Sequence, residues 1–259
     1  MSRITATRTT IDADGGISAR KPRPPEAKAR EFGSIEHILL VLDRLESAYG
    51  HESQPADIYA TGEPLDGLML TLLSQNTNDR NRDAAYESLR SRFPSWGDVA
   101  AADQSEIEAS IRPAGLGNIK AGRMKAILGE IESDFGGHTL AAMKEWDAAR
   151  VREYLSGLHG IGPKTVACVM AFDLGLPAFP VDTHIARISR RLGWVSPRSA
   201  PEKIQLHLEG LVPPERCGGG HLNMIEHGRK KCRARGQVCA SCPLSDACKE
   251  NALFMVTRR

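Results

Sequence analysis

Residues 158–168 read LHGIGPKTVAC, with two glycines around one isoleucine and a proline just before a lysine. Apolar residues recur at helical spacing on both sides of the glycines, at Val151, Tyr154, Leu155 and Leu158 before them and at Val166, Val169 and Met170 after them. Gly160 and Gly162 allow backbone angles closed to other residues, and Ile161 can fill the space between two helices. Pro163 suits a first helical turn, where its missing N–H costs nothing. The stretch therefore predicts two helices joined by a tight hairpin.

The predicted hairpin, over about residues 151–170, has features of a DNA-binding element. Backbone N–H groups at the start of the second helix lack partners within the helix, and neighbouring glycines let a phosphate approach closely. This is typical of a helix-hairpin-helix motif, in which Gly160, Gly162 and Thr165 would contact the DNA backbone. Taken alone, the glycines also fit a turn that only joins two packed helices.

Lys164 and Asp182 are the candidate catalytic pair. The positive end of a helix disfavours a protonated amine, so Lys164 could act as a nucleophile on a sugar C1′ and form a Schiff base. A lysine that only contacts phosphate is the alternative. Asp182, in PVDTHIARISRRLGW, stands where the next helix starts, and helix capping alone could explain it. A carboxylate there could also activate the nucleophile or stabilise positive charge on the sugar.

The cysteines cluster near the C-terminus, with spacing C-x6-C-x2-C-x5-C at Cys232, Cys239, Cys242 and Cys248. Four thiolates on so short a segment can surround one metal centre. Zinc is an alternative metal, although zinc sites usually use two C-x2-C pairs. Disulfide bonds are a second alternative, and the lack of a secretion signal argues against them. Arg233 and Arg235 belong to a run of five basic residues at 229–235, which favours contact with a DNA backbone over a merely solvated helix end.

The remaining two cysteines give no sign of metal binding. Cys168 lies in an apolar run and is expected to be buried, whereas Cys217 lies in a Pro/Gly-rich link without an evident partner.

Composition predicts an all-α protein. Aromatic residues make up 5% of the chain, the formal net charge is +2, and helical spacing dominates over alternation. No apolar stretch could span a bilayer and no secretory signal is present, so we expect no membrane association and a cytoplasmic monomer, near the nucleoid if the source is bacterial or archaeal. Residues 1–33 carry seven basic and four acidic groups with few large apolar side chains, which predicts a flexible basic tail.

Helices are expected at regular intervals after this tail. The first has Ser34 as its N-cap and Gly50 as its stop. The others are predicted at 65–74, 78–92, 103–111, 118–134, 147–157, 163–174, 182–193, 200–211 and 219–231.

The motifs LHGIGPKT, VDTH and the cysteine loop together resemble the endonuclease III family of helix-hairpin-helix DNA glycosylases, over about residues 35–250. The resemblance implies a six-helix domain at 58–176 and an iron–sulfur domain formed by 34–57 and 177–259. A DNA-binding cleft would lie between the two domains. The cysteine loop, 232–248, would hold a [4Fe–4S] cluster.

The resemblance also implies roles for individual residues. Lys164 would be the nucleophile and Asp182 its partner. Leu116, in GLGNIKA, and either Gln75 or Asn76, in LLSQNTND, would fill the gap left by a flipped base. This last segment departs from the family's LLSAQATD, so the choice of amide stays open. A core leucine is the alternative for Leu116, but the glycines on either side of it favour an exposed loop. His184 would line the cleft, with plain packing as its alternative.

The implied activity is that of a bifunctional DNA glycosylase and AP lyase. Its partner would be duplex DNA with damaged bases or abasic sites, and it would remove oxidised pyrimidines such as thymine glycol. The related adenine-excising branch needs a glutamate where this chain has Thr71, and mismatch glycosylases usually lack the hairpin lysine. A non-catalytic iron–sulfur DNA-binding protein is a further alternative, which would not need the pair Lys164 and Asp182.

Overall fold

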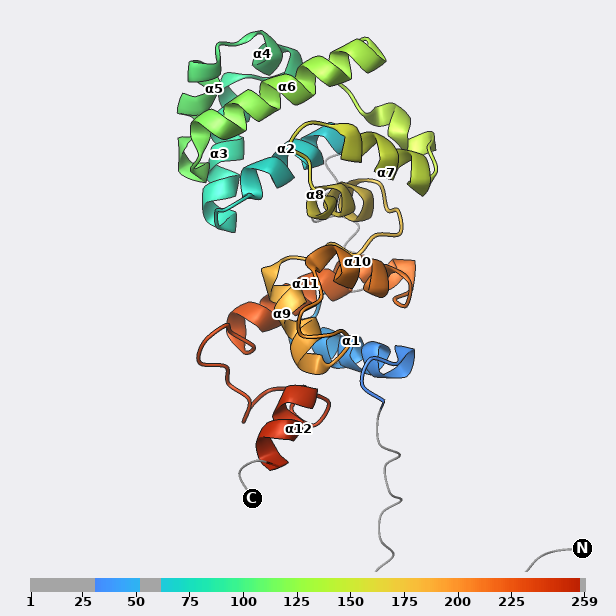
Figure 1. Cartoon of the computed structure of the whole chain (residues 1–259). Helices are drawn as coiled ribbons and strands as arrows, with labels where there is room; N and C mark the ends of the chain where they lie inside the picture. Colours follow the sequence, from blue (N-terminus) through green and yellow to red (C-terminus); the bar gives the residue numbers. More distant parts are fainter. Residues whose placement is uncertain (1–30, 52–61, 257–259) are drawn as a thin grey trace, which may run out of the picture. The chain divides into compact units, whose positions relative to one another are not determined.

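The computed structural model describes residues 31–51 and 62–256, and within these ranges the chain is helical with no β-strand (Figure 1). None of the helices there is long and apolar enough to cross a membrane. The elements are α1 (Ile35–Tyr49), α2 (Pro64–Ser74), α3 (Asp79–Arg92), α4 (Trp96–Ala101), α5 (Gln104–Ser110), η1 (Arg112–Ala114), α6 (Gly117–Phe135), η2 (Ala141–Glu145), α7 (Ala148–Gly157), α8 (Pro163–Cys168), η3 (Val169–Asp173), α9 (Thr183–Leu192), α10 (Pro201–Glu209), α11 (Pro214–Lys230) and α12 (Lys249–Val256).

The first apolar core is built around α2, whose sequence PLDGLMLTLLS is apolar on most of its circumference. A helix with so little polar surface must be covered on several sides. It contacts α3, α6, α8 and η3. The side chains that fill this core include Leu68, Met69, Leu72, Ile107, Met124, Ile127, Leu128, Val151 and Leu155, all fully buried.

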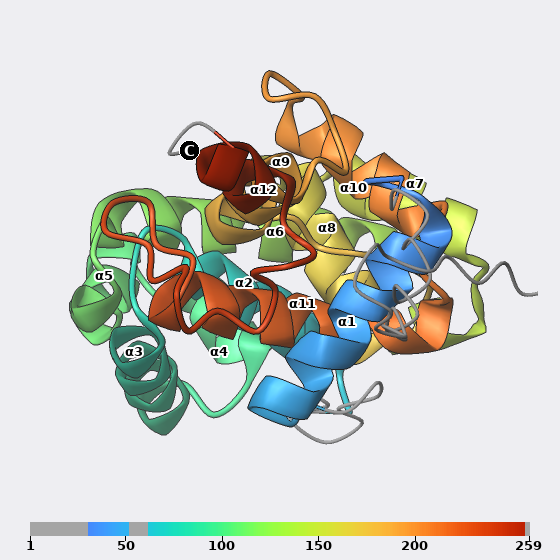
Figure 2. The ribbon, with the colours of Figure 1, turned by 90° about the horizontal axis from the view of Figure 1, so that it is seen from below.

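The second apolar core joins the first described helix to the C-terminal part of the chain. Helix α1 buries Ile38, Val41, Leu42 and Leu45 against α11, which in turn packs on α9 (Figure 2). Segments far apart in sequence thus share one core. The domain boundaries that the resemblance implies remain predictions.

Several predicted helix ends are confirmed. Ser34 Oγ accepts a hydrogen bond from the backbone N–H of His37 at the start of α1, and Gly50 ends that helix in the left-handed region with φ 76°. Residues 1–30 of the predicted tail lie outside the described part of the chain. Phe32, which the prediction also placed in the tail, packs edge-on against His37 with ring centroids 5.3 Å apart.

Two predictions near the hairpin and the cysteines are wrong in detail. The helix expected at 163–174 is α8 followed by a π-helical turn, η3, in which the N–H of Leu174 donates to the carbonyl of Val169. Helix α11 starts at Pro214 instead of residue 219. It therefore contains Cys217, which is buried on the apolar face of the helix and not in a linker.

Candidate functional site

A cleft of about 590 Å³ is lined by helices that contribute to the two apolar cores, namely α2, α8 and η3 from the first and α9 and α11 from the second. Lys164 and Asp182, eighteen positions apart in sequence, line the same cleft. So do the predicted residues Gln75, Asn76, Thr165 and His184, together with Thr71. The residues Gly160, Gly162, Leu116, Arg233 and Arg235 are not part of its lining.

The hairpin before α8 places Lys164 at the cleft wall. Gly160 takes the left-handed conformation, with φ 79°, and a side chain there would come within 3.0 Å of Arg123. Gly162 differs from the prediction, because its φ of −94° and ψ of 168° are open to any residue. A Cβ at Gly162 would nevertheless meet no atom within 4 Å, so the outer side of the turn is free. Pro163 then starts α8 as expected.

Lys164 lies one helical turn before Cys168, and its side chain interacts with the thiol of that residue. Burial raises the pKa of the Cys168 thiol above its ordinary value, so Cys168 stays a neutral, buried residue. The lysine is therefore oriented along its own helix toward the cleft interior.

Asp182 is held at the start of α9. Its Oδ1 accepts a hydrogen bond from the backbone N–H of Ile185 at 2.8 Å, as predicted for an N-cap. His184, which also lines the cleft, accepts at Nδ1 from the guanidinium of Arg187 at 2.9 Å. Arg187 also donates to the carbonyl of Cys232 at 2.8 Å. Asp182 and His184 thus stand on a rigid helix end.

The sequence prediction missed His221, which forms part of the cleft floor. Its Nδ1 donates to the carbonyl of Pro180 at 2.8 Å, and its ring lies edge-on to Phe172 with centroids 5.4 Å apart. Burial, with the charge of Lys164 adding to it, lowers the pKa of His221 to about 4. The imidazole is therefore neutral at physiological pH. In sequence it stands on the apolar face of α11, where nothing distinguishes it from a packing residue.

An ion pair links the two sides of the cleft. Asp79, the first residue of α3, accepts a hydrogen bond from Arg229 of α11 at 2.8 Å, and both residues line the cleft. This bond lowers the pKa of Asp79 below its ordinary value. The sequence analysis included Arg229 in the basic run at 229–235 and did not predict its ion pair with Asp79.

Two loop tips at Asn76 and Leu116 share an unusual backbone conformation. In the described ranges, they are the only non-glycine residues with positive φ, at 54° and 51°. Leu116 is 51% exposed, as its prediction as an inserting residue requires. The buried Lys120 connects the tips, because its Nζ donates to the carbonyls of Leu73 at 2.8 Å and Ala114 at 2.9 Å. Arg123 donates to Gln75 Oε1 at 3.1 Å.

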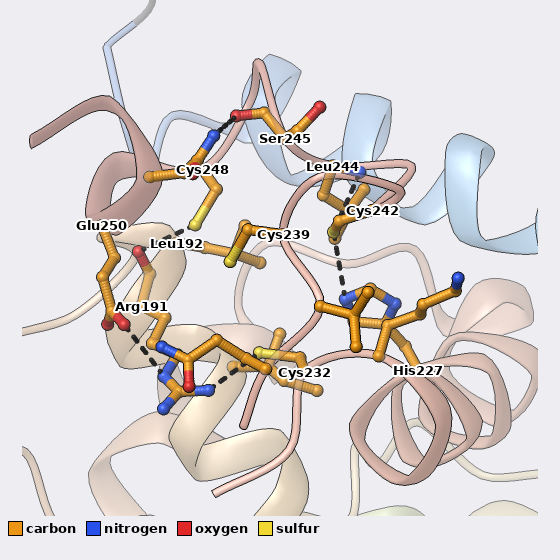
Figure 3. A pocket seen from close by; sticks show the side chains of 15 residues that line it. Arg191, Leu192, His227, Cys232, Cys239, Cys242, Leu244, Ser245, Cys248 and Glu250 are labelled. Atoms are coloured by element: carbon orange, nitrogen blue, oxygen red, sulfur yellow. Dashed lines mark hydrogen bonds and ion pairs between the residues drawn. The ribbon is translucent and has the colours of Figure 1, made fainter. Parts of the chain in front are cut away.

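The four C-terminal cysteines line a second cavity, of about 200 Å³, with their side chains around a common space (Figure 3). Cys232 Sγ accepts from Arg191 at 3.3 Å, and Cys242 Sγ accepts from the N–H of Leu244 at 3.4 Å. Within the described ranges, no three potential metal ligands converge to the spacing of a bound ion. The soft donor set, with N–H groups directed at its sulfurs, fits a cluster of iron and sulfide. Arg233 and Arg235 are exposed on the same loop.

Residues 69–214, which include Lys164 and Asp182 but end before the cysteine loop, match the profile of the HhH-GPD superfamily base excision DNA repair proteins.

The chain belongs to this superfamily.

Its HhH-GPD relatives include a candidate DNA glycosylase of Arabidopsis thaliana, 37% identical over 178 residues, which cover 69% of this chain and 58% of that protein. The endonuclease III of Thermotoga maritima is 32% identical over 187 residues, covering 72% of this chain and 83% of the relative. A trapped covalent intermediate of an endonuclease III with DNA has the same fold, with a TM-score of 0.72 and 27% identity over 86% of this chain and 99% of that one. The chain thus spans little more than half of the plant relative.

Proposed function

We propose that the protein is a bifunctional DNA glycosylase and AP lyase that acts on duplex DNA with damaged bases or abasic sites. The observation that carries the proposal is the presence of Lys164 and Asp182 in one cleft of an HhH-GPD chain, each fixed at a helix start. A non-catalytic DNA-binding protein would have no need for this pair. The resemblance to endonuclease III favours oxidised pyrimidines such as thymine glycol as the bases removed.

In the proposed reaction, Asp182 takes a proton from Lys164, and the free amine attacks C1′ of the damaged nucleotide. The bond from C1′ to the base breaks, its electron pair leaves with the base, and the base takes up the proton that Asp182 holds. The nitrogen then passes a proton to O4′, and the sugar ring opens to a protonated Schiff base on Nζ. Loss of a 2′ proton expels the 3′ phosphate by β-elimination, and water releases the lysine.

The loop tips and the hairpin would hold the DNA in this reaction. A base must leave the stack to reach the cleft, which costs a few kcal/mol of stacking. Leu116 and one of the amides Gln75 or Asn76 would fill the gap, and Asn76 is the one with the strained loop backbone. Gly160, Gly162 and Thr165 would contact the backbone on one side, and Arg233 and Arg235 would add sequence-independent phosphate contacts.

We further propose that Cys232, Cys239, Cys242 and Cys248 hold a [4Fe–4S] cluster. When bound, the cluster would cross-link the loop that presents Arg233 and Arg235. Arg191 and the N–H of Leu244 would stabilise thiolate ligands by hydrogen bonds to sulfur. A purified protein with broad visible absorption that is lost on iron removal would support this assignment, and a colourless protein prepared without oxygen would contradict it.

The proposed activity is tested by single-turnover cleavage of a duplex carrying thymine glycol and of the same duplex carrying an abasic site. Wild type should cleave both on the 3′ side of the lesion. Lys164→Gln should lose cleavage of both while still binding DNA, because the amide has no nucleophilic electron pair. Cleavage of both duplexes by Lys164→Gln at the wild-type rate would refute the proposal.

A further inference from the structure

His227 is a buried histidine that lines the cysteine cavity. It stands on α11, five residues before Cys232, and is 1% exposed. Its Nε2 lies 3.8 Å from Cys242 Sγ (Figure 3). On the other side of the ring, Nδ1 lies 2.9 Å from the hydroxyl of Tyr49, a residue of α1. The three side chains thus form a chain of polar contacts from α1 to the cysteine loop.

The chemistry of the two ends fixes the direction of both hydrogen bonds. A cysteine bound to a metal is a thiolate, which can accept a hydrogen bond but has no proton to donate. Nε2 of His227 therefore carries a proton and donates it to Cys242 Sγ, whether the ring is neutral or charged. In the neutral ring the other nitrogen, Nδ1, has a lone pair and accepts from the hydroxyl of Tyr49. The opposite arrangement would set the lone pair of Nε2 against the thiolate.

Two donors meet at the sulfur of Cys242, because the backbone N–H of Leu244 also donates to it, at 3.4 Å. Both Cys242 and Tyr49 pack against the second apolar core, where a hydrogen bond is electrostatically stronger than in water. Donors directed at a cluster sulfur stabilise negative charge, and a cluster that takes up an electron becomes more negative. These hydrogen bonds therefore stabilise the reduced state more than the oxidised state.

We propose that His227, held in place by Tyr49, raises the reduction potential of the iron–sulfur cluster through its hydrogen bond to Cys242. Tyr49 is a positioning residue, since its hydroxyl polarises the imidazole and strengthens the donor at Nε2. Reduction adds one electron to the cluster, and no proton moves and no bond to a cysteine breaks. The inference rests on the proposed cluster and is independent of the proposed glycosylase reaction.

The test is voltammetry of the full-length protein on an electrode, without oxygen, with iron per chain measured for each variant. His227→Leu removes the donor and should lower the potential of the one-electron wave. At a fixed potential, the ratio of oxidised to reduced cluster should rise about three- to tenfold, which corresponds to about 28–59 mV. His227→Gln places an amide N–H near the position of Nε2 and should stay within about twofold of wild type. Tyr49→Phe keeps the ring and should change the ratio in the same direction as His227→Leu, by about twofold.

Two further variants separate this role from general packing. His221→Leu is the matched control, because it removes another buried histidine of α11 that lines the cleft instead of the cysteine cavity. It should leave the potential unchanged. The double variant with Tyr49→Phe and His227→Leu should match His227→Leu alone, because Tyr49 acts on the cluster only through the imidazole.

Several results would overturn the inference. An iron-loaded His227→Leu with an unchanged or higher potential would do so, as would an equal shift in His221→Leu or additive shifts in the double variant. If His227→Leu retains no iron, Tyr49→Phe decides, and a potential at or above that of wild type refutes the role. Iron-loaded wild type without a one-electron wave also contradicts it. Wild type that holds zinc or no metal would overturn the cluster assignment as well, so the two failures are distinguishable.

Discussion

Lys120 is the buried cation that connects the two loop tips, and its removal should separate folding stability from DNA binding in a measurable way. Lys120→Met keeps the length of the side chain and deletes Nζ, which donates to the carbonyls of Leu73 and Ala114. A hydrogen bond from a charged donor contributes about 1.5–3 kcal/mol, and the two carbonyls would be left without this donor. Burial lowers the pKa of Lys120, which shows that its desolvation is costly and offsets part of this gain.

Weighing both effects, we expect the variant to lose about 2–4 kcal/mol of unfolding free energy in urea. We also expect its affinity for a duplex with an abasic-site analogue to fall at least about tenfold, because both tips lose their common anchor.

Lys125→Met is the matched control. Lys125 lies on the same helix, α6, and its Nζ donates to the carbonyls of Ala100 and Ala102, away from the tips. It should lower stability but leave the DNA affinity within about twofold of wild type. A loss of less than about 1 kcal/mol in Lys120→Met, or an equal loss of affinity in Lys125→Met, would refute the reasoning.

Three other predictions concern the hairpin, the buried acid and the cysteine loop. Gly160→Ala should lower the free energy of unfolding in urea by about 1–2 kcal/mol, because the φ of Gly160 is 79°. Gly162→Ala should leave this free energy nearly unchanged and weaken DNA binding. Equal stabilities of the two variants would contradict the backbone argument. Burial raises the pKa of Asp173 to about 8 in the folded protein, and this pKa is about 3.9 in the unfolded chain. The free energy of unfolding of the wild type should therefore decrease as the pH rises from about 5 to about 8. The folded chain holds a proton there that the unfolded chain has lost, so Asp173→Asn should flatten this decline, and parallel pH curves would count against a neutral acid. Arg233→Ala and Arg235→Ala should each weaken binding to every duplex and reduce by about one the slope of log affinity against log salt concentration. Fluorescence titrations at several salt concentrations measure both, and an unchanged affinity and slope would contradict the prediction.

Much of the site was predictable because its signals are local in sequence. Helix starts are set by a residue and its nearest neighbours, so Ser34 and Asp182 could be identified as caps and Pro163 as a first-turn residue. The exposure of Leu116 followed from its two flanking glycines in the same way.

The missed residues depend on contacts between distant segments. Asp173 and His221 reach the cleft through a π-helical turn and through the packing of α11, and neither feature has a pattern in the sequence. The period of the apolar residues continues through 163–174, so it predicts one uninterrupted helix. The short helices α4 and α12 were missed because six and eight residues carry too few turns for a clear period. The capping box of Ser95 and Asp98 was the available signal for α4.

The central claim is that Lys164 forms a covalent bond with the sugar of a damaged nucleotide. Wild-type protein incubated with a lesion-bearing duplex and borohydride, then digested and analysed by mass spectrometry, tests it most directly. The account predicts one reduced adduct, attached to the peptide that contains Lys164 and absent from Lys164→Ala. An adduct on another residue that persists in Lys164→Ala, or cleavage of the duplex by wild type without any trapped adduct, would contradict it.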